Sequence, residues 1–138
     1  MARSSRLTRR SAAILLGTML LVPALADRAQ AQSAIVRLVI DYGDGVTKTI
    51  TALAWVKGST VLDVMNAAKS LPHGISFSYS GSGGASFLTR IDDVANEGAG
   101  KKNWQLWINT SYADKSFAVL EVQPSDVVFW RFTTQEGK

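Results

Sequence analysis

The amino-acid sequence predicts an α+β domain in which one helix packs on one face of a mixed β-sheet. Two observations support this fold class. Apolar and polar residues alternate over several short segments, as they do in half-buried strands. One segment, from Val61 to Ala68, instead has the apolar spacing of an amphipathic helix. Because this helix follows two strands and precedes several others, we expect a single helix layer on a single sheet.

The first two strands are predicted at Ala34–Tyr42 and Val46–Ala54. Gly43-Asp44-Gly45 lies between them. A glycine at such a position can adopt the positive φ that a tight hairpin turn requires. The two strands are therefore expected to form a hairpin.

The helix is predicted to begin at Val61 and to end before Pro72. Ser59 or Thr60 can cap its first turn, because a hydroxyl oxygen there accepts a hydrogen bond from a free backbone N–H. Asp63 in the first turn is favoured by the helix dipole.

The rest of the chain reads as short strands joined by polar loops. The Ser80–Ser86 and Asn96–Lys102 segments are glycine-containing loops. The predicted strands are Ile75–Tyr79, Phe87–Ile91, Asn103–Asn109, Phe117–Val122 and Val127–Thr133. A β-grasp arrangement fits this order of elements best, and neither an internal repeat nor a second domain is visible.

The strand Asn103–Asn109 contains two tryptophans that point in opposite directions, because successive strand side chains alternate between faces. We assign Trp104, with Leu106 and Ile108, to the face that packs on the helix. Trp107, with Gln105, lies on the other face. Two interpretations of Trp107 remain open: a recognition surface flanked by amides, or a side chain covered by a second layer or a chain terminus.

Residues 1–31 resemble a signal peptide. A basic segment precedes an apolar run at Ala12–Leu25, which is short for a membrane span and is interrupted by Pro23. Cleavage is predicted after Ala31, which leaves a domain at 32–138. This protein would be secreted or periplasmic, with no stable membrane insertion after cleavage. The alternative is an uncleaved membrane anchor.

Removal of that segment would change the charge of the protein. Five of the 15 basic residues and one of the 11 acidic residues precede Gln32, which leaves ten of each and no net charge. We therefore expect no nucleic acid partner. The chain contains no cysteine, which excludes disulfides, a thiol nucleophile and a thiolate metal site.

The sequence offers little catalytic chemistry. His73 is the only histidine, and no nucleophile elbow accompanies it. Asp92, Asp93 and Glu97 lack the regular spacing of a calcium loop, so a solvated turn is the preferred interpretation and no metal site is predicted. Gly81-Ser82-Gly83-Gly84 lacks the lysine and the following helix of a phosphate-binding loop. We expect a protein that is not an enzyme and has no catalytic cofactor.

Four short motifs, spread in order over nearly the whole predicted domain, resemble those of a known family. They are Gly58-Ser59-Thr60-Val61-Leu62-Asp63-Val64-Met65, Phe87-Leu88-Thr89-Arg90-Ile91, Trp104-Gln105-Leu106 and Asp126-Val127-Val128-Phe129-Trp130. The family is the transcobalamin C-terminal-like β-grasp domain. The resemblance implies a β-grasp fold, no enzyme activity and a corrinoid-binding surface, with cobalamin as the implied ligand. In the vitamin carriers this domain supplies half of the site, and a separate helical domain supplies the other half.

By that resemblance, Trp104, Gln105 and Leu106 are candidate ligand contacts, and the strand-face argument adds Trp107. The expected function is a secreted, non-catalytic module that binds a corrinoid or another flat ligand. Its site is expected on the sheet face away from the helix, around Gln105 and Trp107, with the Ser80–Ser86 and Asn96–Lys102 loops as rims. The alternative is a structural or protein-interaction module of the cell envelope, with another envelope protein as partner and no small-molecule ligand.

Overall fold

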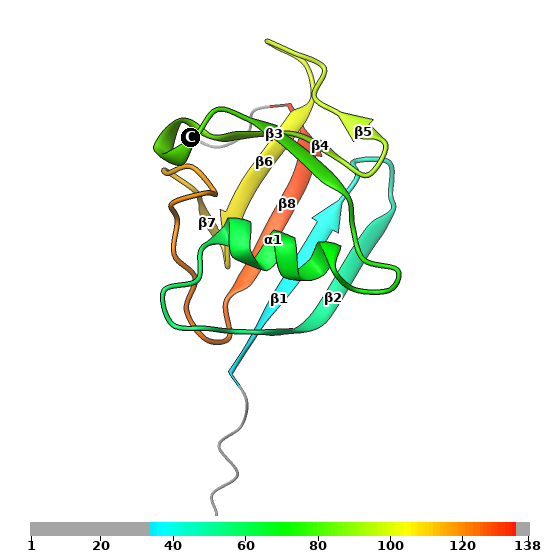
Figure 1. Ribbon diagram of the computed structural model, residues 1–138. Helices are drawn as coiled ribbons and strands as arrows, with labels where there is room; N and C mark the ends of the chain where they lie inside the picture. Colours follow the sequence, from blue (N-terminus) through cyan, green and yellow to red (C-terminus); the bar gives the residue numbers. More distant parts are fainter. Residues whose placement is uncertain (1–33, 135–138) are drawn as a thin grey trace, which may run out of the picture. The chain divides into compact units, whose positions relative to one another are not determined.

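A computed structural model describes residues 34–134, so the predicted signal peptide lies outside the described residues. It contains one α-helix, a five-stranded sheet and a three-stranded sheet (Figure 1). The five-stranded sheet has the order β2-β1-β8-β6-β7, with bounds Thr47–Ala54, Ile35–Asp41, Val127–Thr133, Asn103–Ile108 and Ser111–Tyr112. The small sheet has the order β3-β4-β5, with bounds Phe77–Ser80, Phe87–Ile91 and Val94–Ala95. The predicted α+β class with one helix is confirmed.

The large sheet is mixed because its first and last strands lie side by side. β1 pairs with β8 in parallel, and the pairs β1–β2, β6–β8 and β6–β7 are antiparallel. The turn between β1 and β2 depends on Gly43, whose φ is +73°. A Cβ atom at this position would lie 2.3 Å from the carbonyl oxygen of Phe132, so only glycine fits.

The helix α1, Val61–Lys69, is capped at its N-terminus by Thr60, one of the two predicted caps. The Thr60 hydroxyl accepts a hydrogen bond from the Asp63 backbone N–H, and the Asp63 carboxylate accepts one from the Thr60 backbone N–H. The next two free N–H groups of the first turn, those of Val61 and Leu62, donate to carbonyl oxygens of residues 120 and 117. The segment that follows β7 therefore fixes the start of the helix.

That segment corrects one prediction. Phe117–Val122 was expected to be a strand, but it forms a turn with a single bridge between Glu121 and Thr60. The carbonyl oxygens of Phe117 and Leu120 accept hydrogen bonds from the start of the helix rather than from a neighbouring strand. Phe117 and Val122 are buried nonetheless, so the apolar pattern that suggested a strand reflects the burial of a turn.

The remaining differences are small. The structure adds the two-residue strands β5 and β7, and it places β3 two residues later than the predicted start at Ile75. A short 3-10 turn, Gly83–Ala85, lies within the loop predicted at Ser80–Ser86. Strands of two residues carry no alternation that a sequence pattern could reveal.

The core lies between α1, the inner face of the large sheet and the small sheet. Figure 1 shows α1 crossing one face of the large sheet, with β3 and β4 above it in this view. Trp104 and Leu106 are buried, which confirms the predicted inner face of β6. Other buried residues include Val36, Leu38, Ile40, Leu53, Val61, Val64, Met65, Ala68, Ile75, Leu88, Ile91, Val128, Trp130 and Phe132.

Candidate functional site

A cavity of about 250 Å³ lies beside β6, between this strand, β4 and the segment at 113–117. Its floor is apolar: Leu88, Leu106, Trp104, Trp130 and Phe117 line it, and all five are buried. The rings of Phe117 and Trp130 meet edge to face, with centroids 5.7 Å apart. Side chains packed in this way form a rigid wall.

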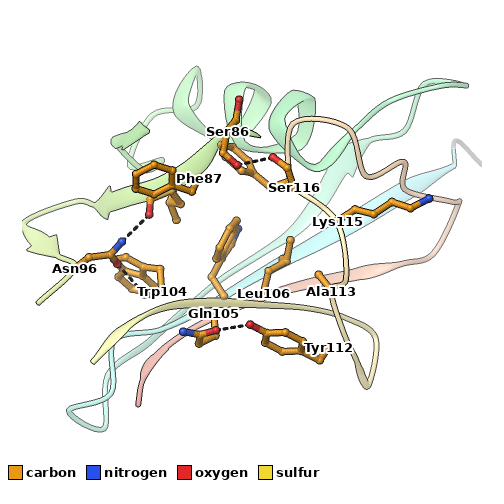
Figure 2. A pocket seen from close by; sticks show the side chains of 13 residues that line it. Ser86, Phe87, Asn96, Trp104, Gln105, Leu106, Tyr112, Ala113, Lys115 and Ser116 are labelled. Carbon is orange, nitrogen blue, oxygen red and sulfur yellow. Dashed lines mark hydrogen bonds between the residues drawn. The ribbon is translucent and has the colours of Figure 1, made fainter. Parts of the chain in front are cut away.

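Asn96 joins the small sheet to β6 at one end of the cavity. Its side-chain amide nitrogen donates to the carbonyl oxygen of Leu88 at 2.7 Å, and its side-chain oxygen accepts from the backbone N–H of Trp104 at 2.8 Å. The Trp104 indole N–H in turn donates to the carbonyl oxygen of Val94 at 2.9 Å. The three bonds together fix the indole of Trp104 in the floor of the cavity, and Figure 2 shows the two that Asn96 forms.

At the opposite wall, Ser116 links its segment to the start of β4. The Ser116 hydroxyl donates to the carbonyl oxygen of Ser86 at 2.6 Å. Ser86 is buried, and it is the only buried polar residue among those described. The phenyl ring beside it, that of Phe87, is 56% exposed and forms part of the rim.

A polar pair forms the lower rim. The Tyr112 hydroxyl donates to the side-chain oxygen of Gln105 at 2.6 Å. Figure 2 shows this pair on one side of β6, with Ser86, Phe87 and Ser116 on the other side. Gln105 belongs to the outer face by alternation, and it reaches the cavity because β7 covers only the last part of β6.

One donor in the cavity wall is unpaired. The Trp130 indole N–H is buried and has no acceptor among residues 34–134. The lining contains Lys115 and no carboxylate.

The four predicted site residues are divided between two places. Trp104, Gln105 and Leu106 line the cavity, and Trp107 does not. Trp107 lies on the outer face of the sheet, half-buried against the rings of Tyr112 and Phe129, whose centroids are 5.3 Å and 5.8 Å away. Of the two predicted rim loops, Ser86 and Asn96 reach the cavity. The cavity thus opens at the edge of β6 rather than on the outer face around Trp107.

Sequence reasoning missed several residues of this site, and for different reasons. Phe117 and Ser116 belong to the segment that was read partly as a strand, so their position beside β4 was not foreseen. Asn96 belongs to a loop that was predicted as a rim, but its hydrogen bonds to Leu88 and Trp104 were not foreseen. The sequence pattern could have pointed to Trp130, because both faces of the last strand are apolar. Such a strand is buried on both sides or faces a ligand.

The acidic residues have a structural role in the turns around Tyr42. Asp92 accepts hydrogen bonds from the Tyr42 hydroxyl and from the Ser76 backbone N–H, and its carboxylate lies 3.9 Å from the Lys48 ammonium. Burial, followed by the hydrogen bond to Asp92 and the negative charges nearby, raises the pKa of the Tyr42 phenol far above its usual value of 10. Within residues 34–134, no group of three or more acidic, histidine or cysteine side chains could hold a metal ion.

The comparison with protein families gives one match. The profile of the family described as "Domain of unknown function (DUF4430)" matches residues 58–134, which is more than half of the 138-residue chain. The chain belongs to this family. The matched region runs from the residues before α1 through β8, so it includes every residue that lines the cavity.

A search of curated proteins found no match to the chain. The family match does not link the chain to the transcobalamin C-terminal-like domains. Among the described residues, no helix has the length and the apolar character that crossing a bilayer would require.

Proposed function

We propose that this protein is an exported, non-catalytic module that binds a ligand beside Trp104-Gln105-Leu106. One observation carries the proposal: three residues that the sequence singles out line a preformed cavity with an apolar floor and a polar rim. Binding sites for small molecules typically combine an apolar lining with a few polar groups that fix orientation. Export rests on the signal-peptide pattern at 1–31, and mass spectrometry of the exported protein should find Gln32 at its N-terminus.

The chemistry of the lining supports binding rather than catalysis. The cavity is lined by two serines and contains no histidine, aspartate or glutamate that could act as a general base. The Ser116 hydroxyl donates to the Ser86 carbonyl oxygen, so its proton is not directed at the cavity. Lys115 is exposed, and no serine in the lining forms a hydrogen bond with it among the described residues.

The fold supports a relationship with the transcobalamin C-terminal-like β-grasp domains. In a β-grasp arrangement we expect one helix against a mixed sheet, and here the parallel pair of β1 and β8 lies at the centre of the sheet that α1 covers. A corrinoid is the most specific ligand that this relationship suggests. The cavity is slightly smaller than the roughly 300–1,000 Å³ of sites for drug-sized ligands. It would therefore hold one edge of a macrocycle, as half of a site shared with another domain.

The outer face of the sheet supports a second candidate, an envelope protein-interaction module. Neighbouring residues on the five strands form one lateral row on this face: Thr49, Val39, Phe129, Trp107 and Tyr112. Aromatic residues are enriched in the centres of protein interfaces. This face has no helix layer, since α1 is the only α-helix among the described residues and lies on the other side.

A titration with cobalamin and related tetrapyrroles, followed by tryptophan fluorescence, separates the two candidates. Gln105→Ala should weaken binding about fivefold, because it removes one rim hydrogen-bonding group. Trp107→Ala, on the outer face, is the matched control and should leave the affinity unchanged. Loss of binding in Trp107→Ala alone would move the site to the outer face. No binding at millimolar ligand to the unaltered protein would favour the interaction module.

A further inference from the structure

We infer that the cavity beside β6 binds a short, extended peptide whose backbone pairs in parallel with the free edge of β6 at Gln105. This inference rests on the proposed ligand-binding function and names the class of ligand. It starts from the backbone of β6 rather than from a side chain. Along the cavity, the edge of β6 that faces away from β8 is occupied at both ends and free between them.

The backbone groups of successive strand residues point alternately to the two sides of the strand. Directly after β6, the Asn109 N–H donates to the carbonyl oxygen of Val127 on β8 at 2.8 Å, so the odd-numbered residues of β6 face β8. The even-numbered residues Trp104 and Leu106 therefore face the opposite edge. β7 covers this edge only as far as Trp107.

Two hydrogen bonds agree with this direction, and they occupy the ends of the edge. The Trp104 N–H donates to the side-chain oxygen of Asn96 at 2.8 Å. The Leu106 carbonyl oxygen accepts from the Ala113 N–H at 2.9 Å. In Figure 2, Asn96 and Ala113 lie at opposite ends of this stretch of β6.

The two backbone groups between these ends are free. The Trp104 carbonyl oxygen and the Leu106 N–H have no hydrogen-bond partner among residues 34–134, since Ala113 donates to Leu106 without accepting from it. Trp104 and Leu106 are both buried, and buried backbone groups without a partner are rare. Both residues line the cavity, so a ligand that enters it can supply the missing donor and acceptor.

The positions of the two free groups select the direction of the peptide. In parallel pairing, one peptide residue opposite Gln105 donates its N–H to the Trp104 carbonyl oxygen and accepts from the Leu106 N–H. An antiparallel peptide would also direct a carbonyl oxygen at the Trp104 N–H and an N–H at the Leu106 carbonyl oxygen. Asn96 and Ala113 already occupy those two places. A parallel peptide therefore fits without displacing either residue.

The occupied ends also limit the length of the peptide. In a parallel strand, backbone groups two residues before and after the paired residue return to the same edge. Here they would meet Asn96 and Ala113. The free stretch therefore accommodates one paired residue and the amide group on each side of it. The cavity volume of about 250 Å³, below that of sites for drug-sized ligands, agrees with a fragment this short.

Alternation places the side chains of the peptide as well. The paired residue shares the outer face with Gln105. The next residue shares the inner face with Leu106, where Leu88, Phe117 and Trp130 form the apolar floor. The best ligand thus has an apolar residue directly after the paired one. Main-chain hydrogen bonds and a side-chain pocket together are how added strands are recognised.

The probe is N-acetyl-alanine isopentylamide. Its alanine supplies the N–H and the carbonyl group for the edge of β6, and its isopentyl group corresponds to a following leucine without the carboxyl group. The matched probe is O-acetyl-lactic acid isopentylamide, in which an ester oxygen replaces the alanine N–H. The experiment follows backbone and indole N–H signals in nitrogen-15 NMR spectra of the protein expressed from its full 138-residue sequence.

The alanine probe should shift the Leu106 backbone N–H signal downfield with saturation, because this group gains an acceptor. The Trp55 indole signal is the internal control and should stay in place, because its N–H already donates to the Val122 carbonyl oxygen. The lactic acid probe should bind about fivefold more weakly, as expected for the loss of one neutral hydrogen bond.

Three results would overturn the inference. If the two probes bind equally, the cavity accepts ligands without pairing to their backbone, and the proposed function survives. If the alanine probe shifts the Trp107 signals and leaves that of Leu106 in place, the ligand lies on the outer face. If neither probe shifts a signal of the cavity residues while cobalamin still binds, the ligand class is wrong and the binding function stands.

Discussion

The two faces of β6 carry one tryptophan each, and the two indoles have different environments. Trp104 is 6% exposed, its backbone and indole N–H groups are both hydrogen-bonded, and its ring contacts Tyr42 and Phe132. Trp107 is half-buried, and its ring lies against the rings of Tyr112 and Phe129 on the neighbouring strands. The alternation of a strand thus separates the two side chains, but the layers on each side decide how deeply each is buried.

The difference also separates two possible functions. On the inner face, the packing that buries Trp104 leaves a cavity between β6, β4 and the segment at 113–117. On the outer face, Trp107 belongs to the lateral row in which Phe129 and Tyr112 are the other aromatic residues. A small ligand that needs a hollow with an apolar floor fits the first face, and a partner that needs a flat surface fits the second.

The largest test of this comparison is the pair of substitutions at the two tryptophans. Trp104→Ala should lower the free energy of unfolding by about 3–5 kcal/mol, as for a buried aromatic residue. Trp107→Ala should lower it by about 1–2 kcal/mol, because a half-buried ring loses less contact. Urea denaturation with an unchanged m-value measures both. A larger loss at Trp107 than at Trp104 would mean that the faces are reversed.

A smaller effect is expected at Asn96, which fixes the Trp104 side of the strand to the small sheet. Asn96→Ala removes hydrogen bonds to the Leu88 carbonyl oxygen and the Trp104 N–H, so it should cost about 2 kcal/mol of stability. Asn66→Ala, on the exposed surface of α1, is the matched control and should change stability by less than about 0.5 kcal/mol. Equal effects at both positions would show that the Asn96 bridge contributes nothing.

The smallest effect concerns pH and the ring of Tyr42, which packs edge to face on Trp104 at 5.8 Å. Burial and the hydrogen bond to Asp92 raise the pKa of this phenol above its usual 10, so the unfolded chain loses the proton first as the pH rises. The contribution of the Tyr42 phenol to the free energy of unfolding is therefore complete below pH 10 and is lost as the pH rises above 10. One proton bound by the folded state alone would lower the free energy of unfolding by ~1.4 kcal/mol per pH unit. The loss at Tyr42 should be smaller than this, because water screens the partly exposed ring.

Thermal denaturation between pH 9 and pH 11 measures this dependence, and Tyr42→Phe should make it shallower. If the unaltered protein and Tyr42→Phe lose stability in parallel, the Tyr42 phenol does not titrate differently in the folded and unfolded states.

Local patterns predicted most elements of this fold. Val127–Thr133 is a strand with the predicted bounds, and the helix begins at the predicted Val61, because alternation and capping are properties of neighbouring residues. The segment Phe117–Val122 was misread because it has apolar residues at its ends, as a strand would. Its turn is fixed by hydrogen bonds to the start of α1, which lies far away in the sequence.

Local sequence patterns also could not predict which distant segments meet at the candidate site. Trp104, Gln105 and Leu106 are consecutive and could be found as a motif, whereas the cavity needs Leu88, Phe117 and Trp130 from three other segments. No local pattern states that these segments meet. The unpaired donor of Trp130 is a property of the assembled wall, and it is visible only when every neighbour of the indole is known.

The parallel pairing of β1 and β8 has a mechanical consequence. The described segment begins just before β1 and ends just after β8, and the two strands run side by side from Arg37 and Val127 to Asp41 and Arg131. A pull on residues 34 and 134 in opposite directions would draw the two strands past each other along their length. All the hydrogen bonds between them would then bear the load together instead of opening one at a time. Tension along the chain would therefore meet its greatest resistance at the centre of the sheet, beside the buried face that forms the cavity.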